Sequence, residues 1–409
     1  MPVDETHDPA LESWVDSAND PASDFPIQNL PYCRFRDEST GGPRAGVRIG
    51  DQILDITAAF SIGSAESIMA MPRAARIDLR RRASALLARN ARPAPELLRP
   101  AGEAELLLPC AIGDYTDFFA SLDHATNVGC LFRPGNPLQP NYKWLPVAYH
   151  GRASSIVLSG TTIRRPRGQI ANRREGPPVF APTRRLDYEM ELGAFIGPGN
   201  PMGTAIPVRE AADHVVGVCL LNDWSARDIQ TWEYQPLGPF LAKSFATSIS
   251  PWVVTLEALE PFRTEPRPRA ASDPPPLPYL RNPGKDAFAI TVEVWLRSPG
   301  MREPMLVSRG NFGSMYWTFA QMVAHHTSNG CPLRAGDLIG SGTISGPEKQ
   351  NRGCLLEMTR GGAEPLRLPS GETRTFLEDG DEVILRGYCE APGFRRIGLG
   401  ECRGTVGHT

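Results

Sequence analysis

The sequence predicts a β-rich protein of the α+β class, divided into a small N-terminal part and a larger C-terminal part. Three observations predict this class. The 39 glycines and 40 prolines are about a fifth of the 409 residues, against a usual share of about 12%, so many turns and short strands are expected. Strand-like runs recur from residue 113 to the C-terminus. Only two stretches clearly favour helix.

Composition and charge exclude several classes of protein. The chain has 43 Lys+Arg and 46 Asp+Glu, a net charge of −3, so no basic excess marks a nucleic-acid-binding protein. No window approaches about 18 uninterrupted apolar residues, so we expect no membrane span. The eight cysteines are scattered without a CxxC pair, which is typical of reduced thiols. The acidic N-terminus lacks the pattern of a secretory signal, so we expect a cytoplasmic protein.

The N-terminal part is expected to contain a flexible arm and a small domain. Residues 1–23 are acidic, with almost no apolar periodicity, which predicts the arm. Short alternating runs between residues 35 and 60 predict small antiparallel strands. Residues 65–90 favour helix by propensity. We therefore place the flexible arm at 1–23 and the N-terminal domain at 24–112.

The C-terminal part, at 113–409, is expected to consist mainly of strands, with one clear helix. The helix is predicted over Met315–His325, where apolar residues recur at i, i+4, i+7 and i+8. Residues 261–278 are rich in proline and should form an extended surface connection away from any site. The predicted strands, most of them bounded by Gly, Pro, Asn or Asp, are Ser155–Leu158, Leu186–Ile196, Val215–Leu221, Phe288–Leu296, Asp337–Ser341 and Glu382–Leu385.

Two glutamates of one predicted strand are the first candidates for chemistry. Glu189 and Glu191 are two residues apart, so both side chains project from the same face of the strand. Like charges this close need solvent, a basic neighbour, a proton or a divalent cation. The residues alone favour a solvent-exposed face, because strands that alternate polar and apolar residues are commonly half-exposed.

A carboxylate at the end of a buried strand is the next candidate. The run Val215–Leu221 is apolar without alternation and is followed directly by Asn222 and Asp223, which predicts an acid at the edge of a cleft. Nearby Arg227 could be an ordinary ion-pair partner of Asp223 or Asp228. Several carboxylates without clustered Cys or His would suit Mg²⁺ or Ca²⁺ rather than zinc.

The remaining motifs narrow the chemistry only partly. His124 follows an acidic cluster in a polar stretch and is a candidate base exposed to a cleft. The glycine-rich run Gly340–Gly346 lacks the lysine of a phosphate-binding loop, and its free backbone N–H groups could bind an anion. No GxSxG nucleophile motif is present. The residues alone indicate a β-rich enzyme or a cation-binding protein with a carboxylate cluster.

Long motifs at these clusters resemble the fumarylacetoacetase family. They include DYTDFF, HATNVG, LPVAYHGRASSIVLSG, NDWSARDIQTWEYQPLGPFLAKSF, HHTSNGCPLRAGDLIGSGTISG and DGDEV. The resemblance runs from Asp24 nearly to the C-terminus. It implies a homodimer in which each subunit has a small SH3-like N-terminal barrel and a large mixed β-roll catalytic domain. The implied reaction is hydrolysis of a carbon–carbon bond in a 1,3-diketo acid, giving fumarate and acetoacetate in tyrosine and phenylalanine breakdown.

The resemblance also implies the site residues. Those that correspond to the family's ligands of Mg²⁺ or Ca²⁺ are Asp117, Glu189, Glu191 and Asp223, with a further cation contact region at Asp223, Lys243 and Thr247. Those that correspond to its substrate contacts are Arg133, Tyr149, Gln230, Tyr234 and Thr343. One departure is Phe119, where the family commonly has a tyrosine that contacts substrate, so substrate preference could differ.

The implied roles fit the chemistry of the reaction. By the resemblance, His124 is the general base that activates water, and Glu357 holds its ring in the required tautomer. The donors that would stabilise the oxyanion are Arg227, Gln230 and Lys243. A divalent cation would stabilise the carbon leaving group as an enolate. The alternatives are a hydrolase of another diketo acid, such as an acylpyruvate, and a non-catalytic calcium-stabilised binding protein.

Overall fold

The N-terminal part contains a small antiparallel sheet covered by three helices. The structure is a computed structural model that describes residues 3–36, 42–171 and 176–408. The sheet has the order β4-β3-β2-β1-β5 and its strands are β1 (Tyr32–Arg36), β2 (Pro43–Ile49), β3 (Gln52–Asp55), β4 (Leu98–Pro100) and β5 (Glu105–Leu107). The helices are α1 (Ile56–Phe60), α2 (Ala65–Met69) and α3 (Arg73–Leu87). The helix predicted over 65–90 is therefore two helices. It breaks before Pro72, which lacks the N–H that would continue α2.

The C-terminal part is built on two packed sheets. The first has the order β7-β6-β22-β13-β14-β16-β8, with β17 on β14. Its strands are β6 (Tyr115–Phe118), β7 (Ala148–His150), β8 (Ile156–Leu158), β13 (Met190–Ile196), β14 (Val215–Asp223), β16 (Thr247–Ile249), β17 (Val254–Thr255) and β22 (Leu338–Gly340). The second has the order β21-β20-β25-β26-β9. Its strands are β9 (Ile163–Arg164), β20 (Thr291–Arg297), β21 (Met305–Asn311), β25 (Glu382–Cys389) and β26 (Ile397–Gly407).

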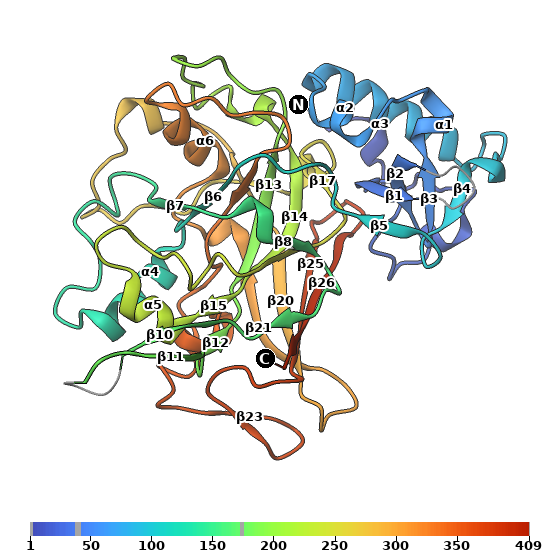
Figure 1. Cartoon of the computed structure of the whole chain (residues 1–409). Helices are drawn as coiled ribbons and strands as arrows, with labels where there is room; N and C mark the ends of the chain where they lie inside the picture. The colour runs from blue at the N-terminus through green and yellow to red at the C-terminus, as the bar shows by residue number, and fades with distance from the viewer. Residues whose placement is uncertain (1–2, 37–41, 172–175, 409) are drawn as a thin grey trace.

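Short hairpins and four helices complete this part. The helices are α4 (Leu122–Phe132), α5 (Arg227–Glu233), α6 (Phe319–Thr327) and α7 (Leu355–Met358). The short strands β10 (Arg167–Ile170), β11 (Val179–Pro182), β12 (Leu186–Asp187) and β15 (Ser225–Ala226) lie beside α5, and β18 (Arg263–Thr264), β19 (Ala287–Phe288), β23 (Leu366–Arg367) and β24 (Thr373–Arg374) pair elsewhere. Figure 1 shows the N-terminal sheet, in blue and cyan, at one side of this larger body. The predicted β-rich α+β class is confirmed.

The main core lies between the two C-terminal sheets. Leu192 and Leu220 of the first sheet are fully buried in one cluster with Val294 and Leu385 of the second. The predicted helix over Met315–His325 begins later, at the first residue of α6, because the Thr318 side chain caps it and forms a capping box with Gln321. No helix within the described ranges is both long and apolar enough to cross a membrane.

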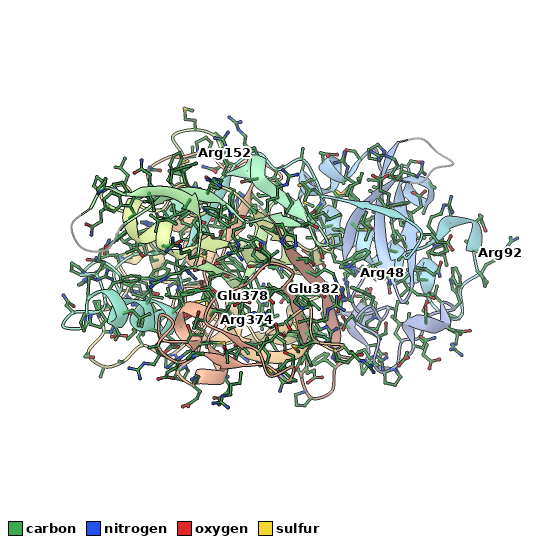
Figure 2. The ribbon with its side chains drawn as sticks, turned by 60° about the horizontal axis from the view of Figure 1, so that its bottom comes forward. Arg48, Arg92, Arg152, Arg374, Glu378 and Glu382 are labelled. Carbon is green, nitrogen blue, oxygen red and sulfur yellow. The ribbon has the colours of Figure 1, made fainter. Side chains whose placement is uncertain are left out.

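The two parts share buried contacts. Arg76 of α3 donates from Nη2 to the backbone oxygen of Val215, 3.0 Å away. Arg48, labelled in Figure 2, lies 5.1 Å from the ring centroids of Phe25 and Trp252. In the segment predicted as a flexible arm, His7 is 2% exposed and its Nε2 lies 2.8 Å from the backbone oxygen of Glu257. Residues 3–23 therefore have buried contacts, and the arm's flexibility stays a prediction about dynamics.

Candidate active site

A cavity of about 290 Å³ opens at one edge of the first C-terminal sheet. Its walls come from β6, β7, β13, α4, α5 and the two loops after α5 and β22. The described lining contains most of the predicted site residues: Asp117, His124, Arg133, Tyr149, Glu189, Glu191, Arg227, Gln230, Tyr234, Lys243 and Thr343. Segments that are far apart in the sequence thus meet around one cavity.

Three carboxylates meet where neighbouring strands end. Ligand atoms of Asp117 (β6), Glu191 (β13) and Asp223 (β14) all lie within 4.8 Å of one another. Strand β22 separates β6 from β13, and its residue Gly340 makes the approach possible. A Cβ at this glycine would lie 2.4 Å from Asp117 Oδ1, so a larger residue would push that carboxylate away.

The glycine-rich loop after β22 also holds two of these acids. The backbone N–H of Gly342 donates to Glu191 Oε2 at 2.9 Å and to Asp117 Oδ1 at 3.2 Å. This residue has a φ of +75° and a Cβ there would meet the backbone oxygen of Phe118 at 2.3 Å. Of the free N–H groups expected of this loop, that of Gly342 therefore binds carboxylates of the protein itself, while those of Ser341 and Ile344 donate to backbone oxygens.

The glutamate pair faces the cavity rather than solvent. Glu189 and Glu191 are 5% and 0% exposed, and both line the cavity, while Met190 between them points into the main core. The residue pattern alone favoured solvent, because it cannot distinguish a solvated face from a polar cavity. The face is covered instead by Arg227, Lys243 and His124 of α4, all of which lie close to Glu189.

Two cations neutralise part of this acidic cluster. Lys243 Nζ donates to Glu189 Oε2 at 2.5 Å and to Asp223 Oδ2. Arg227 Nη1 pairs with Glu189 Oε1 at 2.8 Å. Burial alone would raise the pKa of Glu189, but these two cations hold it below its usual value.

The charges of Asp117, Glu191 and Asp223 are less fully neutralised, although Asp223 also contacts Lys243. Burial raises the pKa of Asp117, and burial together with the charges of its neighbours raises the pKa of Glu191. Asp223 has a raised pKa for the same reasons, although Lys243 opposes the shift. A site of this kind stores electrostatic repulsion that a bound cation or protons would relieve.

The residues fit a hard divalent cation. Glu191 Oε1 and Asp223 Oδ1 are buried and have no hydrogen-bond partner among the described residues. Unpartnered carboxylate oxygens aimed at a shared centre are what Mg²⁺ and Ca²⁺ bind. Thr247, implied as a further contact, is paired in register with Asp223 across β16 and β14 and is buried. It lines a neighbouring cavity together with Lys243.

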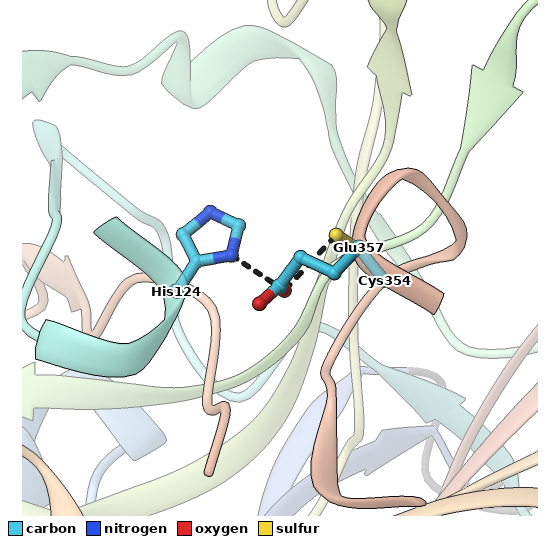
Figure 3. A group of neighbouring side chains, drawn as sticks. All are labelled: His124, Cys354 and Glu357. Carbon is cyan, nitrogen blue, oxygen red and sulfur yellow. Dashed lines mark hydrogen bonds and ion pairs between the residues drawn. The ribbon is translucent and has the colours of Figure 1, made fainter. Parts of the chain in front are cut away.

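His124, which lines the cavity, is paired with Glu357. Figure 3 shows these two side chains with Cys354. His124 Nδ1 donates to Glu357 Oε2 at 2.6 Å, and its Nε2 lies 3.9 Å from Glu189 Oε1. A carboxylate acceptor at Nδ1 requires the proton on that nitrogen, which leaves Nε2 with a free lone pair. The ring is 3% exposed, so a water at Nε2 would lie inside the cavity.

The carboxylate of Glu357 is held by four donors. Oε2 also accepts from Ser345 Oγ at 2.8 Å and from Cys354 Sγ at 3.2 Å, and Oε1 accepts from Asn127 Nδ2 at 2.8 Å. Burial opposes ionisation, but His124 and these donors bring the pKa of Glu357 to about 2. Glu357 is therefore an anion near neutral pH and accepts hydrogen bonds with both oxygens.

The helix that carries His124 is fixed from two sides. Ser121 Oγ accepts from the backbone N–H of His124 at 3.2 Å and donates to the backbone oxygen of Ser345 at 3.0 Å. On the outer side, Arg267 Nη1 pairs with Asp123 at 2.6 Å. Arg267 belongs to the proline-rich connection, which therefore contacts the helix of the candidate base. None of the connection's described residues lines the cavity itself.

The predicted substrate contacts line the same cavity, and several of their donors have no partner in the described part of the chain. Tyr149 donates from its hydroxyl to Asp223 Oδ2 at 2.7 Å. Arg227 Nη2, Arg133 Nε and Thr343 Oγ1 are buried without a hydrogen-bond partner in the described part of the chain. Phe119 also lines the cavity, and its ring lies edge-on to that of His124 at 5.1 Å. Phe119 therefore packs against the candidate base, but its side chain has no hydroxyl that could bind a substrate.

Several residues of the site escaped sequence reasoning. Tyr115 donates to Asp117 Oδ2 at 2.7 Å, and its only sequence signal was its place two residues before that acid. Arg227 was expected to pair with Asp223 or Asp228, but its ion-pair partners are Asp187 and Glu189. Two of the donors to Glu357, His124 and Asn127, lie more than 200 residues from it in the sequence, so no local pattern could indicate them.

Comparisons with known proteins agree with this architecture. The family model described as fumarylacetoacetase N-terminal matches residues 28–109, and the one described as fumarylacetoacetate hydrolase C-terminal matches residues 115–407. Fumarylacetoacetase of Arabidopsis thaliana is 48% identical over 97% of this chain and 98% of that relative. That of Homo sapiens is 48% identical over 96% and 98%. The structure of a fumarylacetoacetate hydrolase from psychrophilic Exiguobacterium antarcticum has a TM-score of 0.55 at 19% identity, over 93% of this chain and 100% of that chain, which shows the fold alone.

Proposed function

This chain belongs to the fumarylacetoacetate hydrolase family, and we propose on this basis how it works. It is a hydrolase that cleaves the carbon–carbon bond of fumarylacetoacetate into fumarate and acetoacetate, a step of tyrosine and phenylalanine catabolism. His124 activates the water, and the carboxylates at the opposite wall hold a divalent cation. The observation that carries this mechanism is the cavity that His124, Asp117 and Glu191 line together, with Glu357 bonded to His124 and Asp223 grouped with the two acids.

The base is prepared by its surroundings. Glu357 keeps the proton of His124 on Nδ1, so Nε2 can accept a proton from water directed at the substrate ketone. The burial of the ring and its edge-on contact with Phe119 fix its orientation. Positioned general bases contribute about 10²- to 10⁴-fold to rates.

Donors on the opposite side stabilise the charge that develops on oxygen. Attack on the ketone produces an oxyanion, and the buried Nη2 of Arg227 has no partner in the described structure, so it can donate to that oxygen. Gln230 accepts from Arg227 Nη1 at 3.2 Å, which leaves its amide N–H₂ available. Lys243 adds a positive charge next to Asp223. Ion pairs with Asp187, Glu189 and Asp223 hold Arg227 and Lys243 in place before substrate binds, which favours electrostatic stabilisation.

Asp117, Glu189, Glu191 and Asp223 would hold the cation, with Lys243 and Thr247 close by. When bound, such a cation would act as a Lewis acid toward the substrate's carbonyl oxygens and offset negative charge that develops there. Without a carbonyl-linked sink, the electrons of the broken bond would settle on carbon, which is a poor leaving group. The substrate's carboxylates and carbonyls are matched by donors of Arg133, Tyr234 and Thr343, whereas Tyr149 already donates to Asp223 and can only accept from or pack against substrate.

The activity can be measured directly. We expect the diketone ultraviolet absorbance of fumarylacetoacetate to decay with purified protein, to stop with EDTA, and to return with Mg²⁺ or Ca²⁺, while fumarate and acetoacetate accumulate. Decay that persists after complete cation removal would reject the metal assignment. Cleavage of acylpyruvates with no cleavage of fumarylacetoacetate would reject the substrate and indicate that the missing hydroxyl at Phe119 redirects specificity.

The assembly and location are part of the same proposal. We propose a cytoplasmic homodimer with domains at 24–112 and 113–409. Support for the dimer comes from exposed apolar side chains on α5 and the loop after it: Trp232 (47%), Leu237 (97%) and Phe240 (68%). All eight cysteines are free thiols, which is typical of a reducing compartment. Light scattering coupled to gel filtration should give twice the 44.7 kDa chain mass, and a monomer mass at micromolar concentration would reject the dimer.

A further inference from the structure

We propose that Asp187 is a positioning residue for the reaction: its carboxylate fixes the Arg227 guanidinium, while Asp187 itself does not contact the substrate. The inference rests on the proposed function, because it concerns the donor assigned to the oxyanion. Asp187 is not among the described residues that line the cavity, whereas Arg227 is. Any effect of Asp187 on catalysis must therefore act through its neighbours.

The surroundings of Asp187 require a carboxylate. The residue ends β12 and is 0% exposed. Its oxygens accept from Tyr188 N at 2.9 Å, Leu355 N at 2.8 Å, Leu356 N at 3.0 Å and Arg227 Nε at 3.0 Å. All four partners are donors. An asparagine would turn its own N–H₂ toward at least one of them, and a buried polar group would lose its partner.

The contact fixes the direction of the free donor. A guanidinium is planar, so a hydrogen bond at Nε determines where Nη1 and Nη2 point. Nη1 is engaged by Glu189 at 2.8 Å and by Gln230 at 3.2 Å. Nη2 is the buried donor without a partner in the described structure. Because Asp187 holds its Nε edge, Arg227 needs no reorganisation to donate from Nη2 to the oxyanion proposed above.

The same turn of chain supports both halves of the site. The backbone N–H groups of Leu355 and Leu356 hold Asp187, and Glu357, the next residue, holds His124. The base and the oxyanion donor are thus fixed relative to each other through one short segment. We therefore expect replacement of Asp187 to lower the rate more than loss of an ordinary ion pair would, because Asp187 helps to set the distance between the base and the oxyanion donor.

The test compares Asp187→Asn with a matched control, Asp228→Asn. Asp228 follows Arg227 directly and accepts from Thr183 Oγ1 and from the backbone N–H of Arg184, at 2.8 Å for the latter. We expect kcat of Asp187→Asn to fall about 10²-fold, as when an oxyanion donor is displaced, with KM changed less than about threefold. The control should keep kcat within about twofold of the parent.

A double-mutant cycle separates positioning from general structural damage. In an Arg227→Lys background the Nε partner is absent, so adding Asp187→Asn should change kcat by less than about threefold. A kcat within about twofold of the parent for Asp187→Asn, or an undiminished loss in the Arg227→Lys background, would overturn the inference. If Asp187→Asn does not fold, Asp187→Glu, which moves the carboxylate by one methylene, is measured against the same criteria. Absence of hydrolysis by the unmodified protein would instead reject the proposed function.

Discussion

His124 and Glu357 form a unit because every polar atom of the pair except one has a fixed partner. The four donors around Glu357 include Ser345 and Asn127 from two different segments, so the carboxylate has no freedom to rotate. Its anionic state orients the imidazole and leaves Nε2 as the single open position. The orientation of His124 therefore depends on the negative charge of Glu357 rather than on the size of its side chain.

Glu357→Gln should remain folded but lower kcat by about 10²- to 10⁴-fold. The amide N–H₂ would face donors that now bind the carboxylate, and the imidazole proton would lose its anionic acceptor. Steady-state kinetics and circular dichroism check this outcome. The control is Glu364→Gln, an exposed residue nearby that pairs with Lys349 and Arg360 and should leave kcat unchanged. Equal kcat for Glu357→Gln and the parent would contradict the account.

The sequence indicated which residues belong to the site better than it indicated which residues they contact. The spacing of Glu189 and Glu191 placed both on one strand face, and the buried strand before Asp223 placed that acid at an edge. The partners of Arg227 were not predictable, because Asp187 lies 40 positions away in the chain and is brought near by the pairing of β12 with β15. Pairing of two-residue strands leaves no periodic signal in a sequence.

At the scale of elements, α4 is the helix on which the site depends. It begins at a serine cap whose hydroxyl also binds the loop after β22, so the cap joins the base to the opposite wall. The sequence did not indicate this helix, because residues 122–132 mix polar and apolar side chains without a clean stripe. A Ser followed three residues later by His is not a capping box, although Ser121 is itself a preferred cap residue.

Ser121→Ala should cost about 1 kcal/mol of stability and should lower kcat about five- to tenfold, because the base moves relative to the cation site. Ser64→Ala provides the matched control: Ser64 caps α2 in the N-terminal part by accepting from Ser67 N at 3.3 Å. It should cost a similar amount of stability with kcat unchanged. Thermal unfolding measures the stability of both variants, and steady-state kinetics measures their kcat. An equal loss of kcat in both would refute a role for the α4 cap.

At the scale of the whole molecule, the two parts are joined by a buried charge cluster. Glu257 is 1% exposed, and its Oε1 lies 3.5 Å from Arg73 Nε and 3.7 Å from Arg76 Nη2. Burial raises the pKa of Glu257, and Arg76 opposes that rise. The N-terminal residue His7 contacts the same residue's backbone. The acidic composition of residues 1–23 gave no hint of this docking, because only a few of their side chains carry it.

Arg76→Met should lower the free energy of unfolding by about 3 kcal/mol, because it leaves a buried carboxylate less compensated. The loss should be larger at pH 8 than at pH 5. Without Arg76 the pKa of folded Glu257 rises further, so the folded state retains a proton that the unfolded state releases, and stability falls as pH rises above the ordinary pKa of about 4.3.

Urea unfolding at both pH values measures this dependence. Arg82→Met, an exposed position on the same helix that pairs with Asp78 at 3.8 Å, should cost less than about 1 kcal/mol at either pH. A pH-independent loss for Arg76→Met would show that Glu257 is not the group involved.

The central claim is that His124 activates water opposite a cation held by carboxylates, and its most direct test is the rate of fumarylacetoacetate hydrolysis by His124→Asn together with its cation content. Asparagine can still donate to Glu357 but cannot accept a proton from water. The account predicts a folded protein that binds Mg²⁺ or Ca²⁺ as the parent does and hydrolyses at least about 10²-fold more slowly. A variant that retains most of the parent's kcat would contradict it.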